Sequence, residues 1–251
     1  MLLNFILRVI VLLLLSVNLL AENKSKPIFT PEIQPYSVTI IGETHKKTES
    51  IELFKDLIKG YLKNNSCLTI ALEINNNQQS IIEKIMQGRA IASDIEISSV
   101  IDHAALRNMI TDLIDQQRKG ACLKILAIDA GDDVQLRRDE WMALNLINQP
   151  RETPILVLLG ALHSLKKVNW DLSMTKGFPF VAEILSMQGL DVRSYPQIWP
   201  ASECKGDQNM KQRFVLANTK EALTALNKSI FSLLNAFETD STIGVIDGVF
   251  I

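Results

Sequence analysis

The sequence lacks the short motifs that mark several large enzyme classes. It contains no glycine-rich phosphate loop, no Gly-x-Ser-x-Gly elbow, no Cys-x-x-Cys pair and no His-Glu-x-x-His helix. These absences argue against phosphate-loop nucleotide binding, serine catalysis of the α/β-hydrolase type, dithiol redox chemistry and a zincin-type metal site. The chain has only three histidines, so the position of each one is informative.

An excess of charge of either sign is also missing. The 26 Lys and Arg residues nearly balance the 28 Asp and Glu residues, which gives a formal net charge of −2. This balance predicts neither a nucleic-acid partner nor attraction to an acidic membrane surface. No repeat of fixed period and no low-complexity tract interrupts the chain, whose length corresponds to about one domain.

Cysteine is scarce as well. The three cysteines, Cys67, Cys122 and Cys204, allow at most one internal disulfide and leave at least one thiol. Cys67 and Cys122 each stand just before a leucine and a predicted strand. Because a disulfide between neighbouring parallel strands is geometrically demanding, we expect both to be small buried residues without a catalytic role.

The first 21 residues are predicted to be a secretory signal. Met1–Arg8 carries one positive charge, Val9–Leu15 is uninterrupted apolar sequence, and the segment closes on Ala21. The alternative is an uncleaved anchor, but the apolar stretch is shorter than the roughly 18–20 residues that span a bilayer, and Asn18 interrupts it. We therefore expect export to the periplasm or the extracellular space, with cleavage near Ala21 and no other membrane segment.

Apolar runs alternate with amphipathic stretches after an irregular lead-in at residues 22–36. Strands are expected at 37–42, 68–72, 123–128, 155–162, 192–196 and 243–251. Helices are expected at about 48–64, 79–88, 102–119, 134–148, 177–188 and 218–237, and 89–100 is ambiguous. The alternation predicts one α/β domain over residues 37–251, with a mainly parallel sheet flanked by helices.

Four of the predicted strands run directly into residues that can carry chemistry. These residues are Glu43 with His45, Glu73, Asp129 and His163. In an open α/β sheet the ligand crevice lies beyond the carboxyl ends of the parallel strands. The sequence therefore predicts that two histidines and three carboxylates meet at one rim, which is the composition of a hydrolytic or metal-binding site.

The two strand-end histidines have different local contexts. Glu43 and His45 are two residues apart, so they face the same side of an extended segment and the carboxylate can orient the imidazole. His163 follows a long apolar run, and if it is buried it needs a polar partner. The alternatives are that His45 is an exposed loop residue beside Lys46 and that His163 is a satisfied core histidine.

The remaining candidates are supporting groups. A carboxylate at the end of a buried strand must be paired, solvated or coordinating; Glu73 could pair with a lysine, and Asp129 could lie in a solvated loop. Arg138, followed by Asp139, starts the next predicted helix and could reach across the rim to a carboxylate or an anionic substrate group, or could be a surface charge. His103 is interpreted as a helix-start residue.

These residues together resemble a known superfamily. The resemblance covers about Val38 to Ser164 and rests on four short motifs in order: Gly42-Glu43-Thr44-His45, Ala71-Leu72-Glu73, Arg138-Asp139 with Met142-Ala143, and Gly160-Ala161-Leu162-His163. The sequence is similar here to the superfamily that joins erythromycin-esterase-like proteins, ChaN-like haem-binding lipoproteins and the Tiki/TraB group. The last predicted strand is expected to belong to the same core.

The resemblance implies a shared α/β core with a rim site built from Glu43, His45, Glu73 and His163. In the esterase-like branch such residues activate water to open a lactone, in the Tiki branch they are thought to bind a divalent metal for peptide hydrolysis, and the ChaN-like branch binds haem. The chain departs from the esterase-like pattern at Lys46, where a glycine is usual. Its helical insert, residues 80–120, is too modest to predict a large macrolide-type cleft, and the lipid-attachment cysteine of a ChaN-like lipoprotein is missing.

The first functional hypothesis is therefore an exported hydrolase that acts on an ester, lactone or peptide bond in a small-molecule or peptide substrate. His45 or His163 would be the general base, oriented by Glu43 or Glu73. In a variant of this hypothesis, His45, His163 and Glu73 hold a divalent metal that activates the water.

The second hypothesis is a haem- or ligand-binding protein without turnover, for which Tyr61 and Tyr195 are conceivable haem ligands. A third is a scaffold whose strand-end residues form only a structural polar network. The sequence does not fix the oligomeric state.

Overall fold

The structure is a computed structural model, and it describes residues 33–35, 37–63, 66–170, 177–199, 213–233 and 241–251. These residues all belong to one compact unit, residues 31–251. The predicted signal segment, the lead-in up to residue 32 and Cys204 lie outside the described residues. No helix of the described part is long and apolar enough to cross a membrane.

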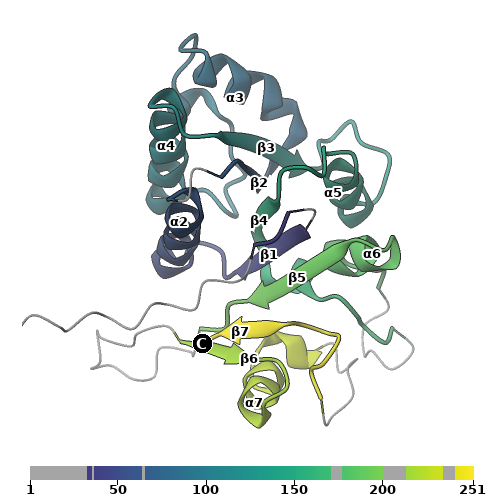
Figure 1. Ribbon diagram of the computed structural model, residues 1–251. Helices are drawn as coiled ribbons and strands as arrows, with labels where there is room; N and C mark the ends of the chain where they lie inside the picture. Colours follow the sequence, from purple (N-terminus) through teal and green to yellow (C-terminus); the bar gives the residue numbers. More distant parts are fainter. Residues whose placement is uncertain (1–32, 36, 64–65, 171–176, 200–212, 234–240) are drawn as a thin grey trace, which may run out of the picture. The chain divides into compact units, whose positions relative to one another are not determined.

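Five parallel strands form the central sheet, in the order β3-β2-β4-β1-β5 (Figure 1). They are β1 Ser37–Glu43, β2 Leu68–Asn75, β3 Leu123–Asp129, β4 Ile155–Gly160 and β5 Asp191–Pro196. The predicted α/β class and the parallel sheet are confirmed. Strand β4 lies between β1 and β2, so the carboxyl ends of these three strands are direct neighbours.

Helices cover both faces of the sheet because its strands are apolar on both sides. One face packs on α2 Thr48–Leu62, α3 Gln79–Met86 and α4 Ala104–Arg118, and the other packs on α5 Arg138–Ile147 and α6 Val181–Met187 (Figure 1). Three short 3-10 helices, η1 Asn76–Gln78, η2 Ala92–Asp94 and η3 Ala161–Ser164, lie in the connections. The predicted role of His103 is confirmed, since its side chain caps α4 by accepting a hydrogen bond from the Leu106 amide.

A small two-stranded sheet with its own helices, formed by the end of the chain, packs beside β5. Strands β6 Phe214–Leu216 and β7 Gly248–Phe250 pair antiparallel, and α7 Lys220–Asn227 and η4 Ile230–Leu233 complete this unit. Strand β6 was not predicted, and the strand expected at 243–251 is shorter than predicted and does not extend the parallel sheet. Val245, Ile246 and Val249 are instead buried in a separate small core with α7, whereas Phe250 packs in the main core and Ile243 is exposed.

Several predicted boundaries are also wrong. Helix α5 begins at Arg138 and not at residue 134, because residues 134–137 are not helical and the backbone of Arg137 is extended. The cap of α7 is Thr219 rather than Asn218, and this helix ends at Asn227. Strand β4 ends at Gly160, so His163 lies on η3 and not at the strand end itself.

The interpretation of two cysteines as unpaired buried residues is wrong. Cys67 and Cys122 form a disulfide, and both residues are exposed. They directly precede Leu68 and Leu123, which are partners in the β2–β3 register, so their Cα atoms lie 4.5 Å apart. This separation is within the range that a disulfide tolerates. The bond joins the beginnings of two neighbouring strands.

The disulfide should stabilise the fold substantially. It links residues 55 positions apart, and the chain-entropy model gives about 4 kcal/mol for a loop of this length. We expect the Cys67→Ser, Cys122→Ser double variant to unfold at a clearly lower urea concentration than the oxidised protein. Cys204→Ser is the control, since it leaves this bond intact. Equal urea midpoints for the double variant and the oxidised protein would contradict the stabilising role.

Candidate functional site

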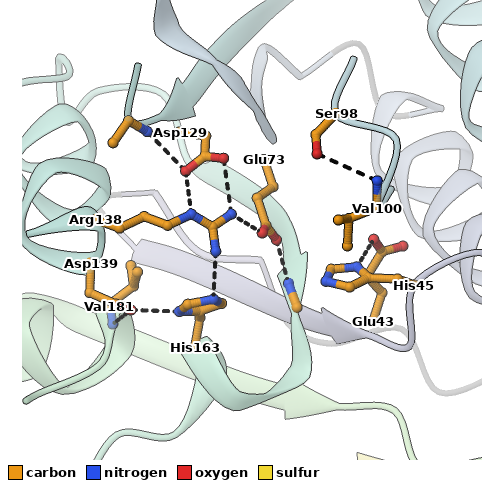
Figure 2. Close-up of polar contacts among 12 residues, drawn as sticks. Glu43, His45, Glu73, Ser98, Val100, Asp129, Arg138, Asp139, His163 and Val181 are labelled. Carbon is orange, nitrogen blue, oxygen red and sulfur yellow. Dashed lines mark hydrogen bonds and ion pairs between the residues drawn. The ribbon is translucent and has the colours of Figure 1, made fainter. Parts of the chain in front are cut away.

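The predicted convergence of strand-end residues is present in the structure. Glu43 and Gly160 are direct register partners at the ends of β1 and β4, and Glu73 lies at the end of the neighbouring β2. Figure 2 shows Arg138 surrounded by Asp129, Glu73 and His163, with His45 and Glu43 beyond Glu73.

His45 and Glu43 form a hydrogen-bonded pair. The His45 Nδ1 lies 3.0 Å from Oε1 of Glu43, whose side chain is 5% exposed, whereas the imidazole is 32% exposed. Because a carboxylate accepts, Nδ1 carries the proton and Nε2 is left with its lone pair. The hydrogen bond to Glu43 raises the pKa of His45; burial works against this rise, and the charge of Glu73 adds to it.

Gly160 lets two imidazoles approach the end of β4. A Cβ atom at this position would lie 3.1 Å from Cε1 and Nε2 of His45 and 3.5 Å from Cδ2 of His163. The Gly160 amide also donates a 2.6 Å hydrogen bond to Oε2 of Glu73. The glycine therefore brings both histidines and one carboxylate to a single point of the rim.

Arg138 connects the carboxylates of two strands to His163. Its Nε and Nη2 donate to both oxygens of Asp129, at 2.7 and 2.9 Å, and Nη2 also contacts Oε1 of Glu73. Burial alone would lower the pKa of Arg138, but its hydrogen bond to Asp129 and the charge of Glu73 raise it above the ordinary value. The interpretation of Arg138 as a group that reaches across the rim to a carboxylate is consistent with this geometry.

His163 is engaged through both ring nitrogens. Nδ1 lies 2.6 Å from Oδ1 of Asp139, which also accepts a hydrogen bond from the Val181 amide at the start of α6. With Nδ1 protonated, Nε2 accepts from Nη1 of Arg138 at 3.3 Å. His163 is therefore held in one tautomer, and its Nε2 lone pair is already used. Of these two histidines, only His45 has an Nε2 that accepts no hydrogen bond in these contacts.

The tentative metal set of His45, His163 and Glu73 does not fit this geometry. Arg138 lies between Glu73 and His163, and both oxygens of Glu73 accept hydrogen bonds, one from Arg138 and one from the Gly160 amide. In the described part of the chain, no three His, Cys, Asp or Glu side chains are grouped so that they could hold a metal ion.

The two tyrosines considered as haem ligands lie away from the rim. Tyr61 packs against the hydrophobic core from α2. Tyr195 is buried against the rings of Phe214 and Phe250, and burial raises its pKa to about 12.

A cleft of about 620 Å³ next to the rim was not predicted from the sequence. Six of its lining residues are apolar: Leu162, Trp170, Phe178, Pro179, Phe180 and Ile230. Arg137, Arg138 and Asp139 lie on its rim side, and Phe180 contacts the His163 ring edge-on. These residues come from α5, η3, the segment before α6 and η4, so no single stretch of sequence shows the cleft.

Lys46 stands where the esterase-like pattern usually has a glycine, and its backbone conformation is unusual for a lysine. Lys46 has a φ of 61°, in the left-handed region that glycine adopts without steric cost. The turn after His45 thus has a conformation for which a glycine is suited, although a lysine occupies it. The pairing of His45 with Glu43 forms with this lysine in place.

Comparison with solved structures shows the fold. The chain is similar to ChaN of Campylobacter jejuni, solved with cofacially bound haem, with a TM-score of 0.51, 11% identity, and coverage of 86% of this chain and 88% of that chain. RRSP, a MARTX toxin effector domain from Vibrio vulnificus, matches with a TM-score of 0.40 and 19% identity over 64% of this chain and 33% of that chain, too weakly to support an argument. No protein-family model matches, and no curated protein matches significantly. The chain therefore has a ChaN-like fold, whereas the esterase-like and Tiki/TraB parts of the resemblance stay predictions.

The pKa of His45 should depend on Glu43. Because the folded-state pKa is raised above 6.5, the protonated pair stabilises the fold at low pH, and this contribution is lost as the pH rises through the folded-state pKa. We expect Glu43→Gln to lower the pKa of His45, measured by NMR titration of its imidazole. Glu49→Gln, on α2, is the matched control. An unchanged His45 midpoint in Glu43→Gln would show that this hydrogen bond does not form.

Proposed function

We propose that the protein is an exported hydrolase in which His45 activates a water molecule for attack on an ester, lactone or peptide bond. The observation that carries this proposal is the pairing of a buried carboxylate with a half-exposed imidazole at a strand end. Glu43 fixes the proton on Nδ1 of His45, which leaves Nε2 as a base directed toward Gly160. Such a base–orienter pair is the common unit of nucleophile activation.

The chemistry follows from the two protonation states of His45. As water attacks the carbonyl carbon, a carbon–oxygen bond forms and the water proton passes to Nε2. Glu43 stabilises the resulting imidazolium, which then returns the proton to the leaving alcohol or amine as its bond to carbon breaks. The hydrogen bond to Glu43 raises the pKa of His45, which makes Nε2 a stronger proton acceptor.

Arg138 and His163 act in this proposal as positioning residues. Arg138 holds Glu73, and Glu73 in turn accepts the Gly160 amide beside the His45 imidazole. His163 orients Arg138 and is itself oriented by Asp139. This chain of contacts keeps the end of β4 close to the proposed base, so a substrate carbonyl can be held there in one orientation.

Export remains part of the proposal, and the disulfide supports it. Disulfides persist mainly in oxidising compartments such as the periplasm and the extracellular space. The exposed bond between Cys67 and Cys122 would be reduced readily in a cytosol. This agrees with the secretory signal predicted for residues 1–21.

A second candidate function is ligand binding without turnover, in which the same rim and cleft hold haem or another small molecule. The shared fold with ChaN and the apolar cleft beside the rim favour it. In the described part of the chain, however, the cleft lining includes no His, Tyr, Met or Cys to ligate the iron.

Removal of the proposed base should abolish hydrolysis while sparing the fold. We expect His45→Ala to lower kcat by about 10²- to 10⁴-fold on any ester, lactone or peptide found in a substrate screen. In the wild type, kcat should fall as the pH drops through the pKa of His45, because Nε2 must be unprotonated to accept a proton. His103→Asn, which keeps a helix-capping side chain, is the control. Full activity in a folded His45→Ala protein would assign the hydrolysis to another site.

The binding alternative makes a separate prediction. If the protein is a hydrolase without an iron ligand in its cleft, titration with micromolar haem should give no saturable, shifted Soret band. The experiment uses the mature chain, residues 22–251, with His45→Ala and His163→Ala variants measured in parallel. A saturable Soret band that disappears in the His163→Ala protein would favour haem binding at this rim over catalysis.

A further inference from the structure

The cationic groups at the cleft are already paired. The Arg137 guanidinium lies 3.8 Å from the centroid of the Phe178 ring and forms an ion pair with Glu140. Arg138 is held by Asp129 and Glu73, as described above. An anionic ligand would therefore have to displace a carboxylate from one of these arginines before it could bind there. Such an exchange replaces one charge-assisted contact with another and gains little.

The rim next to the cleft carries more negative than positive charge. It contains four carboxylates and one guanidinium: Glu43, Glu73, Asp129, Asp139 and Arg138. Arg137 and Glu140 neutralise each other, so they do not change the negative excess at the rim. One proton on His45 would make this excess smaller but would not remove it. Of the four carboxylates and the one guanidinium, only Asp139 and Arg138 line the cleft itself, but walls of low polarity weaken the screening of the charge excess beside it, so we expect the rim to disfavour an anion there.

The remaining lining suits an uncharged group. The six apolar side chains enclose a volume in the range of sites that hold small organic ligands. Trp170 and Phe180 contact each other edge-on, and Glu183 fixes the indole by accepting its N–H at 3.1 Å. The aromatic wall is thus held in place before a ligand arrives.

We propose that the cleft binds an uncharged apolar group, so that the preferred substrates of the rim site are neutral esters, lactones or amides and not carboxylate- or phosphate-bearing ones. The substrate part of this inference rests on the proposed hydrolase function. The binding part does not, because it concerns only the walls and charges of the cleft.

Two fluorescent probes that differ by one charged group test the inference. N-phenyl-1-naphthylamine is neutral, and its 8-sulfonate carries the same rings with one negative charge. We expect the full mature chain to bind the neutral probe more tightly. We also expect the ratio of the sulfonate Kd to the neutral-probe Kd to fall by about two- to five-fold as salt rises from about 0.01 M to about 0.15 M, because screening relieves the repulsion. The neutral probe corrects for effects of salt on apolar binding.

Three variants locate the effect. Glu140→Gln frees the Arg137 guanidinium and should strengthen sulfonate binding about three-fold, with the neutral probe unchanged. Phe178→Ala should weaken the binding of both probes. The matched control is Ile91→Ala, because Ile91 and Phe178 are 64% and 62% exposed and Ile91 does not line the cleft.

The outcomes separate the two proposals. Tighter sulfonate binding, a Kd ratio that rises with salt, or no effect of Phe178→Ala would overturn the inference, and so would the absence of binding by either probe. Preference for the neutral probe with the expected salt trend supports it even if no hydrolysis is found. Hydrolysis that depends on His45 together with tighter sulfonate binding would support the proposed function and disprove this substrate class.

Discussion

The Arg138 guanidinium is the interaction on which the rest of the site depends. It joins the ends of β2 and β3 through Glu73 and Asp129, and it joins them to η3 through His163. Without it, Oε1 of Glu73 and Nε2 of His163 would lose the hydrogen bonds that Arg138 donates, and only their contacts with the Gly160 amide and Asp139 would remain. Without this cation, Glu73 and Asp129 would also repel each other across neighbouring strands, because like charges in a shallow pocket are weakly screened.

The main effect of this cluster is to orient its side chains, and its contribution to the stability of the fold is secondary. The Arg138 side chain is 45% exposed, and solvent screens ion pairs of this kind, so their net contribution to stability is small. The cluster instead fixes directions. It commits both nitrogens of His163, engages both oxygens of Glu73, and leaves Nε2 of His45 as the basic atom that these contacts do not use. A purely structural polar network would not need to leave one basic nitrogen unpaired while it pairs the others.

The sequence predicted the fold class and the meeting of the strand-end residues because both follow from local rules. Apolar runs of strand length reveal the sheet, and a parallel sheet places the residues that follow its strands at one edge. The pairing of Glu43 with His45 needed only a spacing of two. The wrong cysteine prediction and the unpredicted β6–β7 pair both concern contacts between distant parts of the chain. The disulfide depends on the strand register that aligns Cys67 with Cys122, and β6 pairs with β7 across α7 and η4.

The cleft was missed for the same reason, since its lining comes from four separate segments. Trp170 and Phe178 look like ordinary apolar residues in the sequence, and no spacing rule relates them to Arg137. The sequence also could not decide between His45 and His163 as the general base. Only the contact with Arg138 shows that its second nitrogen is committed.

Strands β2 and β3 are fastened at both ends, covalently at their beginnings by Cys67–Cys122 and electrostatically at their far ends by Glu73, Asp129 and Arg138. A register slip between them would require breaking one fastening and stretching the other. This half of the sheet is therefore held at both ends. His45 lies outside it, just before the turn at Lys46 that follows β1, so we expect any movement of the rim to be larger at His45 than at Glu73.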